Sequence, residues 1–377
     1  MSTAELEVAL RTAGRAGTST VSPEQALRHS AVWACLRLRA DLISQMPVDV
    51  FRQAGKLQLE VAKPPVLVKP DANWPLQDFL ALSQFDLDRF GNSVSLIRGF
   101  DGAMRPSILE PVPMSDCTVR GVGSRITTWV IGGKEYGPGE VFHERQYPVA
   151  GTPFGLSPLA YAQMTIRGYL SAQEFANAYY SSGGVPLGHL KNTGKTLTSD
   201  ESRLAKQKYR EAVTNRELFV SGKDWELDLT TSTANDAAFI DEQKFSILDV
   251  CRYLGVPGDM IDADTHKGDI TYANITQRNL QLLVMNLAAP IKRREDAFSD
   301  RLVASPRFVK LNEGALLRMD LASRYSAWKI AIDSRQMAPS EARTLDNREP
   351  FTPEQIAEFD LLGLNKAAAA PANGVPA

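Results

Sequence analysis

The strongest hydrophobic periodicity in the chain lies between residues 235 and 302, where two helical patterns flank a short polar loop. In the first pattern, from about residue 236 to 254, Ile240, Ile247, Cys251 and Leu254 fall on one helical face. Gly255 follows where a left-handed cap is favoured, and Pro257 cannot continue the helix. The loop 262–269 contains no large apolar side chain. The pattern therefore predicts a helix, an exposed loop and a second helix.

The second helix is predicted to begin near Asn274, because Gln277 stands three residues later, at the spacing of a capping box. Pro290 lies inside its apolar pattern and predicts a kink rather than an end. The apolar face comprises Ile275, Leu282, Leu283, Leu287, Ile291, Phe298 and Leu302.

The first half of the chain alternates between helical and strand patterns. Residues 1–21 are small and polar and predict a mobile arm. Ser22-Pro23-Glu24-Gln25 predicts the start of a helix that continues to Met46. A strand is predicted at 48–53, a helix at 75–90, and short strands at 94–97, 107–109, 117–119, 126–131 and 141–143.

The second half predicts long helices with a small insert between them. Ser157-Pro158 is a helix start, and the helix is expected to reach residue 180. The insert is predicted to hold strands at 188–190, 217–220 and 225–229 and a helix at 199–213. Strands at 308–311 and 315–319, a helix at 321–334, a capping box at 352–355 and a disordered tail at 365–377 complete an α+β chain.

Several short stretches occur in an order that resembles the portal proteins of tailed bacteriophages, in the family typified by phage HK97. The stretches include Gly91-Asn92, Val141-Phe-His143, Gly155-Leu-Ser-Pro-Leu159 and Tyr272-Ala-Asn274. The resemblance implies an arm (1–21), an α/β wing (22–156), a first stem helix (157–184), a small α/β clip (185–232) and a second stem helix (233–257). It further implies a tunnel loop (258–273), a kinked helix with returning wing strands (274–320), a short helical crown (321–364) and the tail (365–377).

The same resemblance implies a homo-oligomeric ring, dodecameric in virions, at one capsid vertex. Double-stranded DNA would pass through it non-specifically during packaging and ejection. The implied partners are the major capsid protein, the terminase large subunit and a head–tail adaptor, with assembly in the host cytoplasm. The channel-loop residues facing DNA would be Asp262, Asp264, His266, Lys267 and Asp269, and the docking residues of the clip would be Arg203, Lys206 and Arg210. The clip residues also fit an ordinary solvated helix face.

Composition narrows these expectations. The 377 residues are 44% hydrophobic and 23% charged, as in ordinary folded proteins. A formal net charge of −2 argues against a tight DNA binder but not against a conduit. The chain contains no run of 18 apolar residues, so no membrane-spanning helix is predicted. The three distant cysteines, Cys35, Cys117 and Cys251, favour a reducing compartment over a metal cluster. Cys35 and Cys251 lie on apolar helix faces and are predicted to be buried thiols.

Apolar positions on the stem helices also bear on assembly. Two helices per chain are expected to leave Leu159, Ile166, Ile247 and Leu254 without enough cover inside the chain. Neighbouring copies in a closed ring would then bury these side chains.

Three patterns approach known chemistry without matching it, so no catalytic residue, metal or cofactor is predicted. Residues 188–196 approach a phosphate-binding loop, but five residues separate the glycines where four are needed. The loop at Asp262 places its glycine one position late for a calcium loop. Asp86 and Asp88 do not face each other on a helix and are interpreted as solvated surface rather than a nuclease metal pair. His143 is interpreted as bonding a backbone group at a strand end.

Two alternatives to a portal remain open on the sequence. One is a nucleotide hydrolase that uses Gly194-Lys195-Thr196. The other is a different head–tail connector or structural scaffold.

Overall fold

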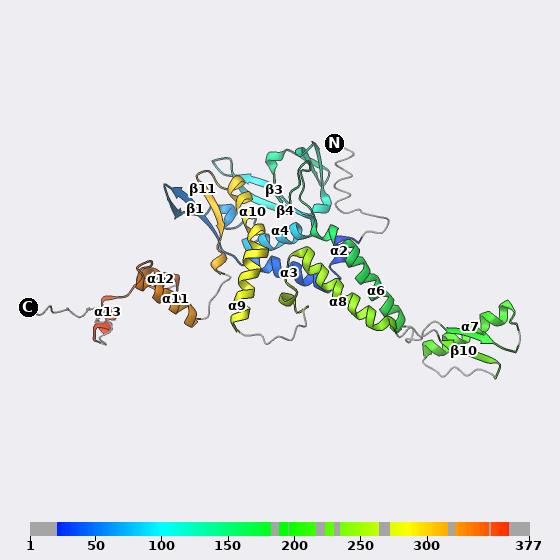
Figure 1. Ribbon diagram of the computed structural model, residues 1–377. Helices are drawn as coiled ribbons and strands as arrows, with labels where there is room; N and C mark the ends of the chain where they lie inside the picture. Colours follow the sequence, from blue (N-terminus) through cyan, green and yellow to red (C-terminus); the bar gives the residue numbers. More distant parts are fainter. Residues whose placement is uncertain are drawn as a thin grey trace, which may run out of the picture. The chain divides into compact units, whose positions relative to one another are not determined.

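The computed structural model describes residues 21–181, 188–194, 196–215, 223–229, 234–263, 272–315, 321–346 and 348–361. Contacts divide the chain into two compact units, Met1–Leu316 and Leu317–Ala377. In the described residues the first unit combines long helices with four small antiparallel sheets (Figure 1), which agrees with the predicted α+β class. The predicted arm and tail lie outside the described residues, apart from Val21.

Three of the sheets are built from the regions predicted as strands. The first has the order β11 (Arg307–Leu311), β1 (Val48–Ala54), β2 (Leu57–Glu60), so a late strand pairs with an early one. The second is β4 (Pro106–Val112), β3 (Asn92–Phe100), β8 (Val141–Arg145). The third is β5 (Cys117–Val122), β6 (Arg125–Ile131), β7 (Lys134–Tyr136). Strands β2 and β7 were not predicted, because four and three residues are too few to show a clear period of two.

The N-terminal helical pattern divides into two helices rather than one. Ser22 caps α2 (Pro23–Ala26) through the predicted capping box with Gln25. The chain then turns, and α3 (Ser30–Ser44) begins with the His29 side chain as its cap. Helix α4 (Leu76–Phe90) ends at Gly91, whose φ of 72° provides the left-handed cap.

Two apolar clusters hold α3 in place. Its Ile43 belongs to the larger one, which joins β1, β11, α4 and the helix around residues 282–302. Its Val32, Cys35 and Leu36 belong to the second, with residues of the stem helices described below. Cys35 and Cys251 are both buried there as free thiols, as predicted. A third cluster lies between β3 and the sheet of β5 and β6.

The long helix after the predicted channel loop is interrupted just before Pro290. It runs as α9 (Tyr272–Gln281), a π-helical segment (Leu282–Leu287) and α10 (Ala288–Arg301). Proline lacks the N–H that an α-helix uses and its ring crowds the preceding turn. A π-helical turn, with bonds five residues apart, is a known accommodation within a helix. The predicted apolar face is buried at Leu282, Leu283, Leu287, Ile291, Phe298 and Leu302.

Helix α4 carries a buried ion pair that connects three helices. Arg39 of α3 binds Asp88 through both ends of its guanidinium, with Nε to Oδ2 at 2.9 Å and Nη2 to Oδ1 at 3.0 Å. Arg39 Nη1 also donates to the carbonyl of Leu254, at 3.1 Å. Burial lowers the pKa of Arg39, but the charge of Asp88 and its hydrogen bonds raise it above its usual value. The interpretation of Asp88 as solvated surface is therefore wrong.

A second buried arginine fixes α10 against the other side of α4. Arg294 Nε donates to Glu144 Oε1 of β8 at 3.1 Å. Its other nitrogens donate to the carbonyl of Leu80 at 3.2 Å and to Ser83 Oγ at 2.9 Å. Burial raises the pKa of Glu144, and the Arg294 charge opposes that increase. Arg39 and Arg294 thus join α4 to distant elements, and each nitrogen of both guanidinium groups donates a hydrogen bond.

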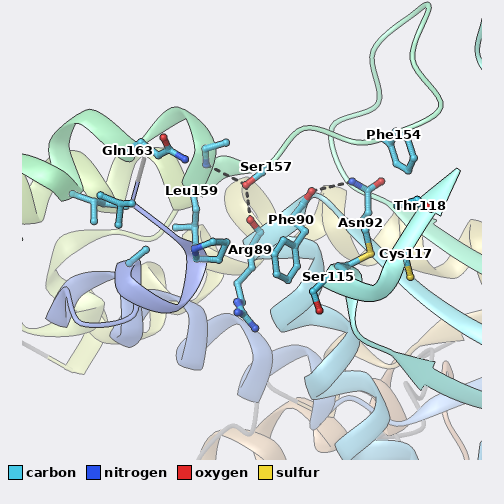
Figure 2. Close-up of a pocket in the computed structure, with 16 residues that line it drawn as sticks. Arg89, Phe90, Asn92, Ser115, Cys117, Thr118, Phe154, Ser157, Leu159 and Gln163 are labelled. Carbon is cyan, nitrogen blue, oxygen red and sulfur yellow. Dashed lines mark hydrogen bonds between the residues drawn. The ribbon is translucent and has the colours of Figure 1, made fainter. Parts of the chain in front are cut away.

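The end of α4 meets the segment before the first stem helix at a close backbone contact. Asn92 Oδ1 accepts from the Gly155 N–H at 2.9 Å, and Asn92 Nδ2 donates to the Gly155 carbonyl at 3.1 Å. A Cβ at Gly155 would lie 2.0 Å from the Gln146 carbonyl oxygen, and one at Gly91 would lie 2.3 Å from that of Leu156. Figure 2 shows Ser157 beside this contact, donating to the Arg89 carbonyl. Two stretches that carried the family resemblance separately are in direct contact.

His143 lies at the same contact. Its Nε2 is 3.0 Å from Asn92 Oδ1, so its partner is a side chain and not the backbone group that was predicted. Burial, together with the nearby Arg145 charge, lowers the pKa of His143 to about 3. The ring is therefore neutral at physiological pH.

The second unit is helical in its described part, with α11 (Leu321–Asp333), α12 (Pro339–Leu345) and α13 (Pro353–Leu361). The capping box at residue 352 is confirmed, because Thr352 N–H and Gln355 N–H donate to each other's side chains. The Arg343 guanidinium lies 3.9 Å from the centre of the Phe351 ring. Of the strand predicted at 315–319, only Ala315 is described, and it ends a short 3₁₀ helix, Glu313–Ala315.

We predict that Asp88→Asn strongly destabilises the chain, because it removes the partner charge of a fully buried arginine. The expected loss is about 3–5 kcal/mol in the free energy of unfolding. The double variant Arg39→Met, Asp88→Leu should lose less than Asp88→Asn, since no charge is left unpaired. Chemical denaturation measures both.

The control for this prediction is Glu135→Gln, which removes the partner of Arg120 in an exposed ion pair. That change should cost at most about 1 kcal/mol. An Asp88→Asn variant as stable as the control would contradict the structural role of the buried pair.

Candidate functional site

Paired helices form the predicted stem. The first is α5 (Pro158–Tyr161) followed by α6 (Gln163–Ser181), and the second is α8 (Ala234–Leu254). Ser157 caps α5 as predicted, with its Oγ accepting from the Ala160 N–H at 3.1 Å. The predicted single helix is interrupted at Ala162. Thr165 Oγ1 of α6 donates to Asp249 Oδ2 of α8 at 2.8 Å, so a polar contact adds to the apolar packing.

The apolar stripes of these helices are covered within the chain, contrary to the prediction. Leu159, Ile166 and Leu254 are 3%, 0% and 1% exposed, and Ile247 packs against the same cluster. The reason is that α3 packs against the two stem helices and contributes a third apolar face to their cluster. Sequence reasoning counted only two stem helices and missed the third.

A different set of apolar side chains on the stem is exposed. Met164 of α6 is 90% exposed, Phe175 is 70% exposed, and Tyr161 of α5 is 61% exposed. Positions 164 and 175 fall close to one face of α6, because eleven residues correspond to about three helical turns. Phe245 of α8 is 60% exposed. Exposed apolar faces of this kind mark surfaces that meet another molecule.

A buried histidine connects both stem helices to α3. His29 Nδ1 accepts from the Ala31 N–H at 3.2 Å, so the other ring nitrogen, Nε2, faces Ser246 Oγ of α8 at 3.3 Å. Ser246 Oγ donates to the Thr165 carbonyl of α6 at 3.4 Å. Burial lowers the pKa of His29 to about 4. The sequence alone does not reveal this role of His29, because its partner Ser246 lies 217 positions away in the chain.

The insert between α6 and α8 is a small α/β module in its described part. Strand β9 (Gly188–Asn192) pairs antiparallel with β10 (Trp225–Leu229), and α7 (Ser199–Asn215) lies between them in sequence. Of the strands predicted in this insert, the one at 217–220 lies outside the described residues. Thr198 and Glu201 cap α7 reciprocally, with Thr198 N to Glu201 Oε2 at 3.0 Å.

This geometry does not form a phosphate-binding loop. Gly188 pairs with Leu229 inside the sheet, so its backbone is not free to wrap a phosphate. Gly194 N–H donates to Asn192 Oδ1 at 2.9 Å, and α7 begins only at Ser199. A phosphate-binding loop needs its helix to open at the lysine and threonine.

The predicted docking cations lie on α7. Arg203 and Lys206 are exposed, and Arg203 makes only a long contact of 3.5 Å to Asp200. Arg210 is on the same helix, but its side chain lies outside the described set. Positions 203, 206 and 210 share one helical face, because they are three and four residues apart. The helix thus presents the cations of Arg203 and Lys206 to solvent.

The C-terminal end of α8 leads to the predicted channel loop. Gly255 has a φ of 63°, which confirms the predicted left-handed position, and a 3₁₀ helix, Gly258–Ile261, follows. Asp262 is exposed and also left-handed, with a φ of 55°. Asp264, His266, Lys267 and Asp269 lie outside the described residues, so their placement stays a prediction.

The two ends of this loop are joined by charge. Arg278 of α9 pairs with Asp259 of the 3₁₀ helix. Arg39 holds the last carbonyl of α8, as described above. The residues before and after the loop are therefore fixed to the body of the first unit. Sequence reasoning missed Asp259 and Arg278, which would have been found only by knowing that the ends converge.

The basic run at residues 292–294 resolves into three different roles. Lys292 Nζ binds Asp296 Oδ1 at 2.7 Å on the helix surface. Arg294 is buried and binds Glu144. The Arg293 guanidinium lies 5.0 Å from the centre of the Tyr147 ring. The run is therefore structural.

Two further features of the described part of the chain concern metal ions and membranes. No cluster of three or more His, Cys, Asp and Glu side chains was found there that is arranged to hold a metal ion. Within the same residues, no helix has both the length and the apolar character that a membrane crossing requires.

Comparisons with known proteins agree with this architecture. The portal protein of Enterobacteria phage HK97 is 24% identical over 360 residues, covering 91% of this chain and 84% of that protein. An HK97-family phage portal protein from Corynebacterium diphtheriae superposes with a TM-score of 0.62 at 18% identity, covering 80% of this chain and 99% of that one. A chain from the neck of a native gene transfer agent particle, computed with C12 symmetry, gives a TM-score of 0.55 at 15% identity, covering 92% and 100%.

The family model described as phage portal protein matches residues 30–347. The match begins at the first residue of α3 and extends past the end of α12. It includes the sheets, the stem pair, the insert and the ends of the channel loop. The chain belongs to the phage portal protein family.

Proposed function

We propose that this chain assembles into a closed ring, of twelve copies in the particle, that forms the channel for double-stranded DNA at one capsid vertex. The observation that carries the proposal is the position of α8 in the chain. This helix connects the insert, which presents exposed cations, to the loop whose ends are held by Arg39 and by the Asp259–Arg278 pair. Family membership and the C12 symmetry reported for the related neck support the ring.

In this proposal the segments take the roles that the family resemblance implied. The sheets within residues 22–156 form the wing, residues 157–184 and 233–257 the stem, 185–232 the clip and 258–273 the tunnel loop. Residues 274–320 return to the wing, and 321–364 form the crown. The ring sits in a virion or in a gene transfer particle, contacts the major capsid protein, and assembles in the host cytoplasm.

The ring acts as a conduit and needs no catalytic step. DNA is moved by the terminase, and the ring must provide a lumen that does not retain phosphates. Tight phosphate contacts release counterions and would hold the DNA. A chain with a net charge of −2 fits sliding better than binding. The hydrolase alternative loses its support, because the loop before α7 lacks the geometry for a phosphate.

The exposed apolar face of the first stem helix is proposed to contact the neighbouring copy. We expect Met164→Glu combined with Phe175→Glu to shift the protein from rings to monomers, because charges would be buried without partners. The apparent assembly constant should fall at least tenfold, measured by native mass spectrometry and electron microscopy at micromolar concentration.

Met104→Glu is the matched control for ring assembly, because Met104 is 75% exposed in a turn between β3 and β4. It should leave the ring yield unchanged. Full ring yield in the Met164, Phe175 variant, or a wild-type chain that is a stable monomer at this concentration, contradicts the proposed contact.

The clip is proposed to dock the terminase large subunit and later the head–tail adaptor. We expect Arg203→Glu with Lys206→Glu to reduce terminase-driven packaging in vitro while rings still form, because both side chains are exposed and Arg203 is only weakly paired. Adding Arg210→Glu should reduce packaging further.

The control for the clip is Lys191→Glu with Lys208→Glu, which changes the charge of the insert equally. Lys191 lies on β9, and Lys208 points away from the face that positions 203, 206 and 210 share. Equal losses in both pairs would indicate a general charge effect. If the Arg203→Glu, Lys206→Glu variant fails to form rings, these two residues lie at contacts between subunits instead.

The channel loop is proposed to keep the lumen mostly negative near the DNA. Replacing Asp262 and Asp264 with lysine should slow DNA passage and shorten the packaged DNA, since the new cations would bind phosphates. The Asp→Asn pair is the control, because asparagine tolerates the left-handed backbone at position 262 and adds no positive charge. Unchanged DNA length in the lysine variant would show that this charge has no part in translocation.

A further inference from the structure

A cavity of about 380 Å³ lies where α2, the end of α4, β5 and the first stem helix meet. Figure 2 shows Phe90, Cys117, Phe154 and Leu159 around it, with Gln163 on the stem helix. Its size is within the range of about 300–1,000 Å³ that ligand pockets occupy. Most of its lining is apolar, and Arg89 is the one charged residue among the lining residues that the structure describes.

Arg89 is incompletely paired. Its Nη2 binds Glu24 Oε1 at 2.6 Å, and its guanidinium lies 4.8 Å from the centre of the Phe90 ring. Its Nε is buried and finds no hydrogen-bond partner among the described residues. A buried donor of this kind favours an acceptor from outside the described structure. The site therefore fits an apolar group accompanied by a carboxylate.

The chain enters the structure at this cavity. Val21, the first described residue, is part of the lining, and the capping box between Ser22 and Gln25 fixes its position. Twenty residues precede it. Within them the large aliphatic side chains are Leu6, Val8 and Leu10, and these alternate with Glu5, Glu7 and Ala9. We call residues 5–10 the anchor segment.

The residues between the anchor segment and Val21 have the composition of a spacer. Residues 11–20 contain two glycines and only small or polar side chains apart from Arg11 and Arg15. For ten residues of this composition the random-coil end-to-end distance is about 17 Å. That distance allows the anchor segment to fold back onto the cavity next to which the chain enters. Attachment to the same chain gives an effective concentration on the order of millimolar.

We propose that the anchor segment of each chain binds in its own cavity. Leu6 and Val8 provide the apolar groups, and Glu5 or Glu7 provides the carboxylate for Arg89. The bound segment would contact α2, β5 and the stem helix together, and so would hold the sheet region to the stem. This inference does not depend on the role of the ring, because it concerns contacts within one chain.

Hydrogen exchange on the full-length protein tests the proposal. Amides of residues 5–10 should exchange at least tenfold more slowly than those of residues 12–20. Ala160→Phe places a ring in the cavity and should remove this protection. Ala178→Phe is the matched control, because Ala178 is exposed further along the first stem helix and does not line the cavity. Equal exchange of the two segments in the wild-type protein overturns the proposal.

Cross-linking gives a second test that does not depend on the folding of a cavity variant. The double variant Val8→Cys, Ser115→Cys should form a disulfide within one chain under mild oxidation, since Ser115 is exposed and lines the cavity. Ala13→Cys with Ser115→Cys is the control and should cross-link at least tenfold less. Covalent dimers on a denaturing gel, or equal cross-linking of the control, would overturn binding within the same chain.

Discussion

The bidentate pairing of Arg39 with Asp88 is the contact on which the arrangement of the stem depends. A guanidinium buried to this degree is tolerated only if its charge and donors are satisfied, and removing its partner is far more costly than losing a surface pair. Asp88 supplies the charge from α4, and the last carbonyl of α8 accepts from the remaining nitrogen. The C-terminal end of α8 is therefore held by α3 and α4. The segment proposed as the channel loop begins a few residues after this point.

A second constraint is steric rather than electrostatic. The backbone at Gly155 approaches those of Gln146 and Gly91 so closely that no side chain fits, and Asn92 hydrogen-bonds both polar groups of Gly155. This contact sets where the first stem helix leaves the sheets. Together with the Arg39 pair, it fixes one end of each stem helix to the same helix, α4. The insert and the channel loop are then displayed by a rigid support, as expected for functional segments.

The apolar side chains of the stem helices fall into two groups. One group is buried within the chain, and the other is exposed and is proposed to contact a neighbouring copy. Leu159, Ile166 and Leu254 look unpaired in sequence but are buried by α3. Tyr161, Met164 and Phe175 remain exposed on the outer face. In the proposed ring the chain acts through its shape and charge, and the proposed role includes no chemical step. The arrangement of covered and uncovered apolar faces, and the sign of the loop charge, thus carry the functional argument.

The sequence by itself determined the elements and their order. Caps at Ser22, Ser157 and Thr352 and the left-handed Gly255 were readable, because capping depends on residues only a few positions apart. The family was also recognisable, because the short stretches that identify it occur in the same order along the chain and need no tertiary structure to be seen. The tertiary structure alone decided which charges are buried. Arg39 and Asp88 are 49 positions apart, and Arg294 and Glu144 are 150 apart, so no local period could pair them. It likewise decided that α3 covers the stem and that Gly91 meets Gly155, since burial depends on which distant segments pack together.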